Sequence, residues 1–126
     1  MLFTIDDKSW KCSRPYKFYD NVYLAYVELQ FIECGDGVLY GRVDRFENKN
    51  GEKRYVVSLS SFEDMDILLH ECIHLVSYIF KDRHIPFDEF NDESIAYYYT
   101  WWFKRLWLKC LSEAEKRAKC LTPKTN

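Results

Sequence analysis

Residues 60–81 read SSFEDMDILLHECIHLVSYIFK, and this stretch decides the fold that the sequence predicts. Its apolar residues recur at helical spacing, at positions 65, 68, 69, 72, 73, 76, 79 and 80. Ser60 lies three residues before Glu63, which is the spacing of a capping box at a helix N-terminus. We therefore expect a helix over about residues 62–81.

The chain that follows predicts a second helix. Residues 82–90 contain Pro86 and are expected to form a loop. Asn91 or Asp92 can cap a helix that runs to about residue 118, with acidic residues in its first turn and basic residues at its end, as the helix dipole favours. A loop of about ten residues lets this helix fold back antiparallel to the first.

The chain before residue 60 is predicted to be rich in β-strands. Residues 21–34, 38–47 and 52–60 carry many aromatic and β-branched residues, and turn signals at 35–37 and at Asn50-Gly51 separate them. We expect these three segments to form an antiparallel meander. Two further expectations are an edge strand at residues 2–6 and an irregular segment at residues 10–20, where Pro15 disfavours a helix.

Together these elements predict an α+β fold, in which an antiparallel sheet of three or four strands packs on the first helix and a long C-terminal helix completes the domain. The length of 126 residues is that of a single domain, with a β-rich part at 1–60 and a two-helix part at 61–120. The formal net charge of −2 argues against a nucleic-acid partner held by counterion release.

The sequence also bears on the compartment. Charges at Asp6, Asp7 and Lys8 interrupt any N-terminal apolar run, and no stretch reaches the roughly 18 apolar residues of a membrane span. The five cysteines are an odd number without repeated spacing, which favours free thiols in a reducing compartment. We expect a cytoplasmic protein without a membrane partner, in which Cys72 is a small buried residue and not a nucleophile.

The predicted first helix contains a metal-binding motif, His70-Glu71-Cys72-Ile73-His74, which has the pattern H-E-x-x-H. Residues four apart on a helix project from one face, so both imidazoles can reach one metal ion. Glu71 lies beside the first ligand and can take a proton from a water molecule that the metal activates. Two core histidines would be the alternative, but two imidazoles and a carboxylate buried together would all need partners.

A catalytic zinc ion usually has three protein ligands, so a third one is sought in the sequence. Glu93 lies 19 residues after His74, at the start of the second helix, and the antiparallel return would bring it opposite the two histidines. The other candidates within reach are His84, Asp88, Glu89 and Asp92.

The motif and the residues after it resemble a known family. HECIH at 70–74, followed by NDESIAY at 91–97, resembles a gluzincin, the branch of zinc metallopeptidases whose third ligand is a Glu on the next helix. Residues 70–102 are similar to small single-domain zincin-like proteins encoded by tailed bacteriophages, and the resemblance covers about residues 60–107. It implies a Zn²⁺ ion held by His70, His74 and Glu93, with Glu71 as general base. It also implies a residue that stabilises the oxyanion, for which Tyr97 is the candidate and His84 the alternative.

The predicted function is therefore that of a zinc-dependent metallopeptidase in the cytoplasm, which is the host cytoplasm if the protein is encoded by a phage. In zincins the cleft runs between the sheet edge and the motif helix, so a protein or peptide substrate would add as a strand there, with residues 52–60 as the expected edge strand. One alternative is a zinc-bound interaction or regulatory protein without turnover, and another is a metal-free interaction protein.

The second helix carries a run of aromatic residues at 97–103, YYYTWWF. Such rings can form a stacking platform for bases or a partner surface. We expect most of them to fill the core instead, because a small domain needs large side chains there. Any rings left exposed could form a dimer contact.

Overall fold

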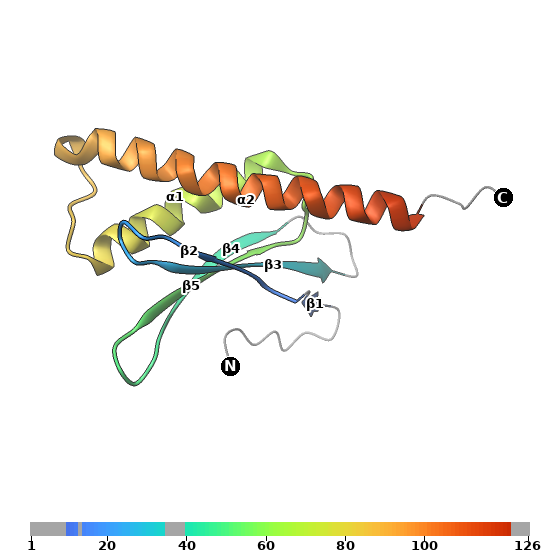
Figure 1. Ribbon diagram of the computed structural model, residues 1–126, viewed down its shortest axis with the longest axis horizontal. Coiled ribbons are helices and arrows are strands. Elements are labelled where there is room, and N and C mark those ends of the chain that lie inside the picture. Colours follow the sequence, from blue (N-terminus) through green and yellow to red (C-terminus); the bar gives the residue numbers. More distant parts are fainter. Residues whose placement is uncertain (1–9, 13, 35–39, 122–126) are drawn as a thin grey trace.

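The computed structural model describes residues 10–12, 14–34 and 40–121, and it has two layers (Figure 1). One layer is a sheet, and the other consists of two long helices that lie across one face of it. The elements in chain order are β1 (Trp10–Cys12), β2 (Tyr16–Tyr19), β3 (Tyr26–Cys34), β4 (Gly41–Glu47), β5 (Lys53–Leu59), α1 (Met65–Asp82), the short 3₁₀ helix η1 (Glu89–Asn91) and α2 (Asp92–Leu121).

The fold class is α+β, as predicted, but the sheet is mixed. Its order is β1-β3-β5-β4, and β2 pairs with β3 on the same edge as β1. Strand β5 lies between β3 and β4, parallel to β3 and antiparallel to β4. The prediction of an antiparallel sheet, and with it the meander order, is therefore wrong. The β4–β5 hairpin was predicted correctly, and Gly51 takes a positive φ of 80° in its turn.

Burial explains why β5 lies in the centre. Both faces of this strand are covered, since Tyr55, Val56, Val57, Ser58 and Leu59 are all fully buried. A strand that is apolar on both faces suits a position between two neighbours. Strand β4 instead carries alternating charges such as Arg42, Asp44 and Arg45, which suit an exposed edge.

Three local predictions need correction or fall outside the described residues. Residues 10–20 are not irregular, because β1 and β2 form there by pairing with β3 on either side of Pro15. Helix α1 is capped by Asp64, whose side chain accepts a hydrogen bond from the Ile67 amide, and not by Ser60. The predicted edge strand at 2–6 and the turn at 35–37 lie outside the described residues.

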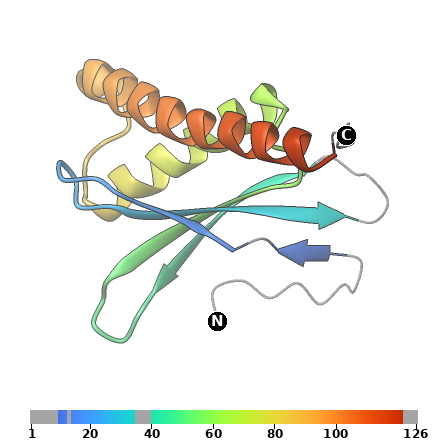
Figure 2. The same cartoon turned by 45° about the vertical axis from the view of Figure 1, so that its right-hand side comes forward.

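The core lies between the helices and the sheet (Figure 2). Within the aromatic run of α2, Tyr98 and Trp102 are buried, and Tyr99, Trp101 and Phe103 are partly buried against the core. Most of these rings therefore fill the interior, as expected. Neither helix has, within the described residues, an apolar stretch of the length and hydropathy that crossing a bilayer requires.

The C-terminal end of α1 is tied to the sheet by charged groups. Asp82 contacts the Nη1 atom of Arg45 at 2.9 Å and the Nζ atom of Lys53 at 3.5 Å, and it accepts a hydrogen bond of 2.6 Å from the Tyr55 hydroxyl. Arg83 donates to the carbonyl oxygen atoms of residues 23 and 24 and to the hydroxyl of Tyr55. These bonds fix the end of the helix on β5 and on the β2–β3 turn.

Candidate metal site

The two motif histidines lie together on the exposed side of α1. Their Nε2 atoms are 3.2 Å apart, and their ring centroids are 4.9 Å apart. Two nitrogen ligands at the zinc–nitrogen distance of a tetrahedral site lie about 3.3 Å from each other, so the pair fits two positions around one zinc ion. The same distance also fits a hydrogen bond between two neutral imidazoles. In the metal-free protein, this bond requires that one Nε2 atom carries a proton and the other does not.

Glu71 turns inward from the same helix turn. The residue is 7% exposed, and its carboxyl group accepts no hydrogen bond from the described residues. Burial raises the pKa of the Glu71 carboxyl above its usual value, while the two neighbouring histidines act in the opposite direction. A carboxyl group in such surroundings has a strengthened affinity for protons, which a general base requires.

Strand β4 approaches α1 closely at this point. A Cβ atom placed on Gly41 would collide with the side chain of Ile67 and come within 2.9 Å of Cγ and 3.2 Å of Oε2 of Glu71. Only glycine therefore lets the strand and the helix pack at this distance. The strand backbone forms a wall against which the Glu71 side chain lies.

A shallow groove of about 370 Å³ opens between the start of β4 and the first half of α1. We call it the histidine groove, and its lining residues are Tyr40, Gly41, Asp64, Asp66, Ile67, His70 and Glu71. Gly41 is the first residue of β4, and no described strand pairs with β4 on the side away from β5. The prediction that residues 52–60 form the edge strand is wrong, since β5 is central and β4 is the strand that borders the groove.

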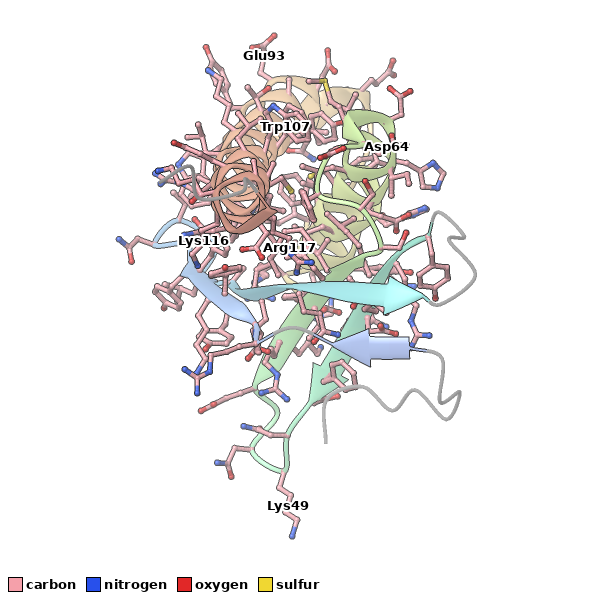
Figure 3. The ribbon with its side chains drawn as sticks, turned by 90° about the vertical axis from the view of Figure 1, so that its right-hand side faces the viewer. Lys49, Asp64, Glu93, Trp107, Lys116 and Arg117 are labelled. Carbon is pink, nitrogen blue, oxygen red and sulfur yellow. The ribbon has the colours of Figure 1, made fainter. Side chains whose placement is uncertain are left out.

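The predicted third ligand is not gathered with the histidine pair. Glu93 is exposed in the first turn of α2, and Figure 3 shows its side chain pointing outward from the molecule. Among the residues that the structure describes, no group of three His, Cys, Asp or Glu side chains has the geometry to hold a metal ion. The structure thus brings His70 and His74 together and leaves Glu93 apart, so its role stays a prediction.

The two candidates for oxyanion stabilisation lie elsewhere. Tyr97 is 74% exposed and lines a cavity between α2 and β2, which shares no lining residue with the histidine groove. His84 follows the end of α1 with a positive φ of 57°, and its amide donates to the carbonyl of Lys81. This conformation ends the helix, which gives His84 a structural role.

Gly41 and the approach of β4 to Glu71 were missed by the sequence reasoning. A signal for them was present, because Gly41 interrupts the otherwise bulky strand segment 38–47. A glycine inside a strand often marks a close approach of another backbone or side chain.

The remaining nucleophile in the motif is inert. Cys72 is fully buried, and burial raises the pKa of its thiol to about 12. The thiol is therefore protonated at neutral pH, which agrees with the expectation of a small buried residue. The side chains of Cys12, Cys34 and Cys120 lie outside the described residues.

Comparisons of the chain with models of protein families, with curated proteins and with solved structures found no match. The functional assignment therefore depends on the site itself, namely on the histidine pair, the buried carboxyl group of Glu71 and the edge strand beside them.

Proposed function

We propose that the protein is a zinc-dependent metallopeptidase of the gluzincin type, in which His70 and His74 bind the metal and Glu71 is the general base. The observation that carries the proposal is the 3.2 Å separation of the two Nε2 atoms beside the buried carboxyl group of Glu71. A zinc ion at this position would acidify a water molecule and polarise the carbonyl group of a peptide.

The residues of the chain have separate tasks in this reaction. Glu71 takes a proton from the attacking water, whose oxygen bonds to the carbonyl carbon of the substrate. Glu71 then passes the proton to the amide nitrogen as the carbon–nitrogen bond breaks. The contact of its side chain with Gly41 restricts where the carboxyl group can lie, so that the group stays within reach of the water.

The edge of β4 that no described strand covers supports a peptide as the substrate. An extended chain can pair with the main-chain groups of an edge strand, and here that strand borders the groove with His70 and Glu71. Such pairing would bring the peptide backbone past Gly41, beside His70 and Glu71. The bound peptide would be held mainly through its backbone.

Glu93 is our proposal for the third ligand, and this rests on its spacing in the sequence and on the resemblance. A second candidate function is a zinc-bound interaction protein without turnover. It is favoured by the exposed position of Glu93, because the three protein ligands that a catalytic zinc ion usually has are not gathered in the described residues. The intact Glu71 favours the enzyme, since a purely structural zinc site has no use for a base.

Metal analysis with matched variants tests the ligands. We expect one zinc ion per chain in the wild type, and a loss of affinity of more than about 100-fold in His70→Asn and His74→Asn, because even residues that only support a ligand contribute about 10- to 100-fold. His84→Asn is the control and should keep the metal. Zinc binding that persists in both motif variants would overturn the site, and stoichiometric zinc in Glu93→Ala would exclude Glu93 as a ligand.

Glu71→Gln separates the two functions. We expect this variant to retain zinc and to lose cleavage by about 10²- to 10⁴-fold, the usual contribution of a general base. The readout is a proteome-wide search for new protein termini in bacteria that express either form. Equal termini with both forms would favour the interaction protein.

A further inference from the structure

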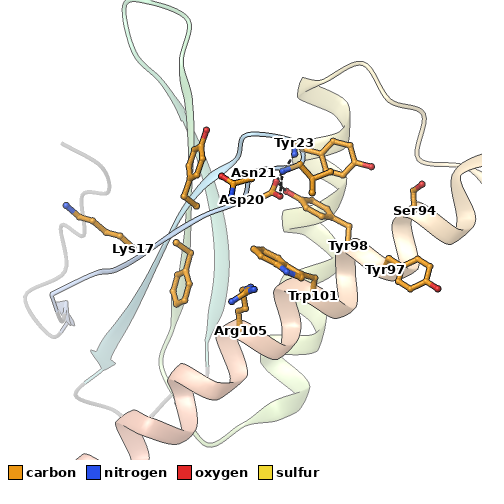
Figure 4. A pocket seen from close by; sticks show the side chains of 12 residues that line it. Lys17, Asp20, Asn21, Tyr23, Ser94, Tyr97, Tyr98, Trp101 and Arg105 are labelled. Atoms are coloured by element: carbon orange, nitrogen blue, oxygen red, sulfur yellow. Dashed lines mark hydrogen bonds between the residues drawn. The ribbon is translucent and has the colours of Figure 1, made fainter.

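A second cavity lies at the opposite edge of the sheet from β4. It has a volume of about 750 Å³, within the range of ligand-binding clefts, and it opens between β2, the β2–β3 turn and α2 (Figure 4). We call it the β2 groove and define it by the lining residues on which the argument depends, namely Lys17, Asp20, Val22, Tyr97, Trp101 and Arg105.

Most of the surface that lines the β2 groove is apolar, and part of it faces solvent. Trp101 and Tyr98 lie parallel at a centroid distance of 6.4 Å and form the floor together with Tyr23. At the rim, Val22 is 75% exposed and Tyr97 is 74% exposed. Large apolar side chains that remain exposed around a cavity are typical of a binding surface.

The charge available in the groove is positive. The only carboxylate among its lining residues, Asp20, is 2% exposed and accepts hydrogen bonds from the amides of Val22 and Tyr23 and from the Tyr98 hydroxyl. Its charge is therefore satisfied within the protein. The guanidinium group of Arg105 lies 4.0 Å from the centre of the Trp101 ring and has no ion pair within the described part of the chain. It can accept a carboxylate from a ligand.

The edge of β2 offers main-chain groups. The Asp20 amide donates to the carbonyl of Ala25, so alternation along the antiparallel pair directs the main-chain groups of Lys17 and Tyr19 away from β3. No described strand pairs with β2 on that side. An extended chain can therefore add to the sheet here.

From these observations we infer that the β2 groove binds an extended acidic segment of a partner protein. The backbone of the segment pairs with the free edge of β2, an apolar or aromatic side chain enters the cavity above Trp101, and a carboxylate contacts Arg105. The groove lies on the opposite edge of the sheet from the histidine groove, so the inference does not depend on the proposed peptidase activity.

A single-stranded nucleic acid fits these contacts less well. Bases bind by stacking on open aromatic faces. Here Arg105 already covers one face of Trp101, and Tyr98 is only 6% exposed. Main-chain pairing along β2 also has no counterpart in a nucleic acid.

A displayed library of random short peptides, selected on the wild-type protein, tests the inference. We expect the selected sequences to combine an apolar or aromatic residue with neighbouring Asp or Glu. The best synthetic peptide, labelled with fluorescein, should lose about tenfold or more in affinity for Arg105→Glu and for Val22→Asp, a change of about 1.4 kcal/mol. Backbone N-methylation at alternate peptide positions should weaken binding similarly, because it removes the donors that pair with β2.

Matched controls lie on the same helix. Lys104→Glu makes the same charge change as Arg105→Glu, and Leu108→Asp places a charge at another exposed apolar position, both outside the groove. Both should bind the peptide like the wild type.

The inference is overturned if no peptide is selected, if selected peptides lack acidic residues, or if Arg105→Glu and Val22→Asp bind as well as their controls. Binding of a labelled thymidine oligonucleotide in place of the peptide would identify a nucleic-acid site. A wild-type dimer in sedimentation that Val22→Asp dissociates would identify a second copy of the chain as the occupant.

Discussion

The middle of α1 and its C-terminal end each hold a carboxyl group with little exposure, and the two groups differ in whether they have partners. At the end, the side chain of Asp82 is 5% exposed and contacts two basic side chains and a hydroxyl group. In the middle of the helix, Glu71 is 7% exposed, and its carboxyl group accepts no hydrogen bond from a described residue. Both carboxyl groups face the sheet, and only one of them is paired.

The difference in pairing indicates that Asp82 stabilises the fold, whereas Glu71 is suited to a chemical role. A buried carboxylate that is fully paired holds two elements in register, and losing a partner is costly. A buried carboxylate without a partner weakens the fold, and such groups gather where a reaction uses them. The contrast therefore supports the proposal that the histidine groove, and not the charged end of α1, is the functional site.

The largest effect is expected at the paired end. Asp82→Asn removes the charge that Arg45, Lys53 and the Tyr55 hydroxyl contact, and it should reduce the free energy of unfolding by about 2–3 kcal/mol, measured by chemical denaturation. Lys81→Gln changes an exposed neighbour on the same helix and should stay within about 0.5 kcal/mol of the wild type. Zinc content should not change in either variant. A loss below 1 kcal/mol in Asp82→Asn would mean that the pairing does not stabilise the helix end.

A smaller effect is expected where β4 meets Glu71. Gly41→Ala places a methyl group against Ile67 and Glu71, and overpacking of this kind costs about 2 kcal/mol. It should also displace the Glu71 carboxyl group, so that cleavage falls while zinc remains bound. Gly51→Ala is the matched control, because it strains the hairpin turn with a positive φ and lies far from the metal site in the sequence. Equal cleavage by both alanine variants would show that Gly41 does not position the carboxyl group of Glu71.

The smallest effect is expected at a third carboxyl group, Glu113, which is paired like Asp82 and not like Glu71. Glu113 on α2 accepts hydrogen bonds from the Tyr16 hydroxyl at 2.6 Å and from Arg117, and the Tyr16 bond is the main cause that lowers the pKa of Glu113 below its usual 4.5. A carboxyl group whose pKa is lower in the folded protein stabilises the fold above the usual pKa, and this contribution is lost as the pH falls through the folded value.

Glu113→Gln should therefore be about 1 kcal/mol less stable than the wild type at neutral pH, and the difference should shrink below pH 4.5. Thermal unfolding at several pH values measures it. Glu115→Gln, at an exposed ion pair with Lys119, should show no such dependence. A deficit that stays constant down to low pH would show that the charge of Glu113 is not the cause.

The parts of the fold that sequence could predict are the ones that depend on neighbouring residues. Helical spacing gave α1 and α2, and Asn50-Gly51 gave the β4–β5 hairpin. The histidine pair belongs to the same class, since residues four apart on a helix must share a face. The order of the strands depends on distant pairings instead. Even so, the charges of β4 are typical of an edge strand, and the apolar run of β5 is typical of a strand in the centre of a sheet.

Whether Glu93 faces the histidine pair depends on the rotation of α2 about its own axis. The sequence offers large rings on several faces of this helix, so it does not specify which face becomes buried. In the structure Tyr98 and Trp102 turn to the core, and the Tyr99 hydroxyl donates to the carbonyl of Leu69 on α1. That rotation leaves Glu93 and Tyr97 exposed.

The parallel pairing of β3 with β5 also has a kinetic consequence. The β4–β5 hairpin can form from a short local turn, but β3 can join it only after the chain from residue 26 to residue 54 has closed into a loop. Long-range closure of this kind slows folding, and until it is complete one edge of the apolar strand β5 has no partner strand. We expect the newly synthesised chain to be most prone to aggregation in that interval, before β3 pairs with β5.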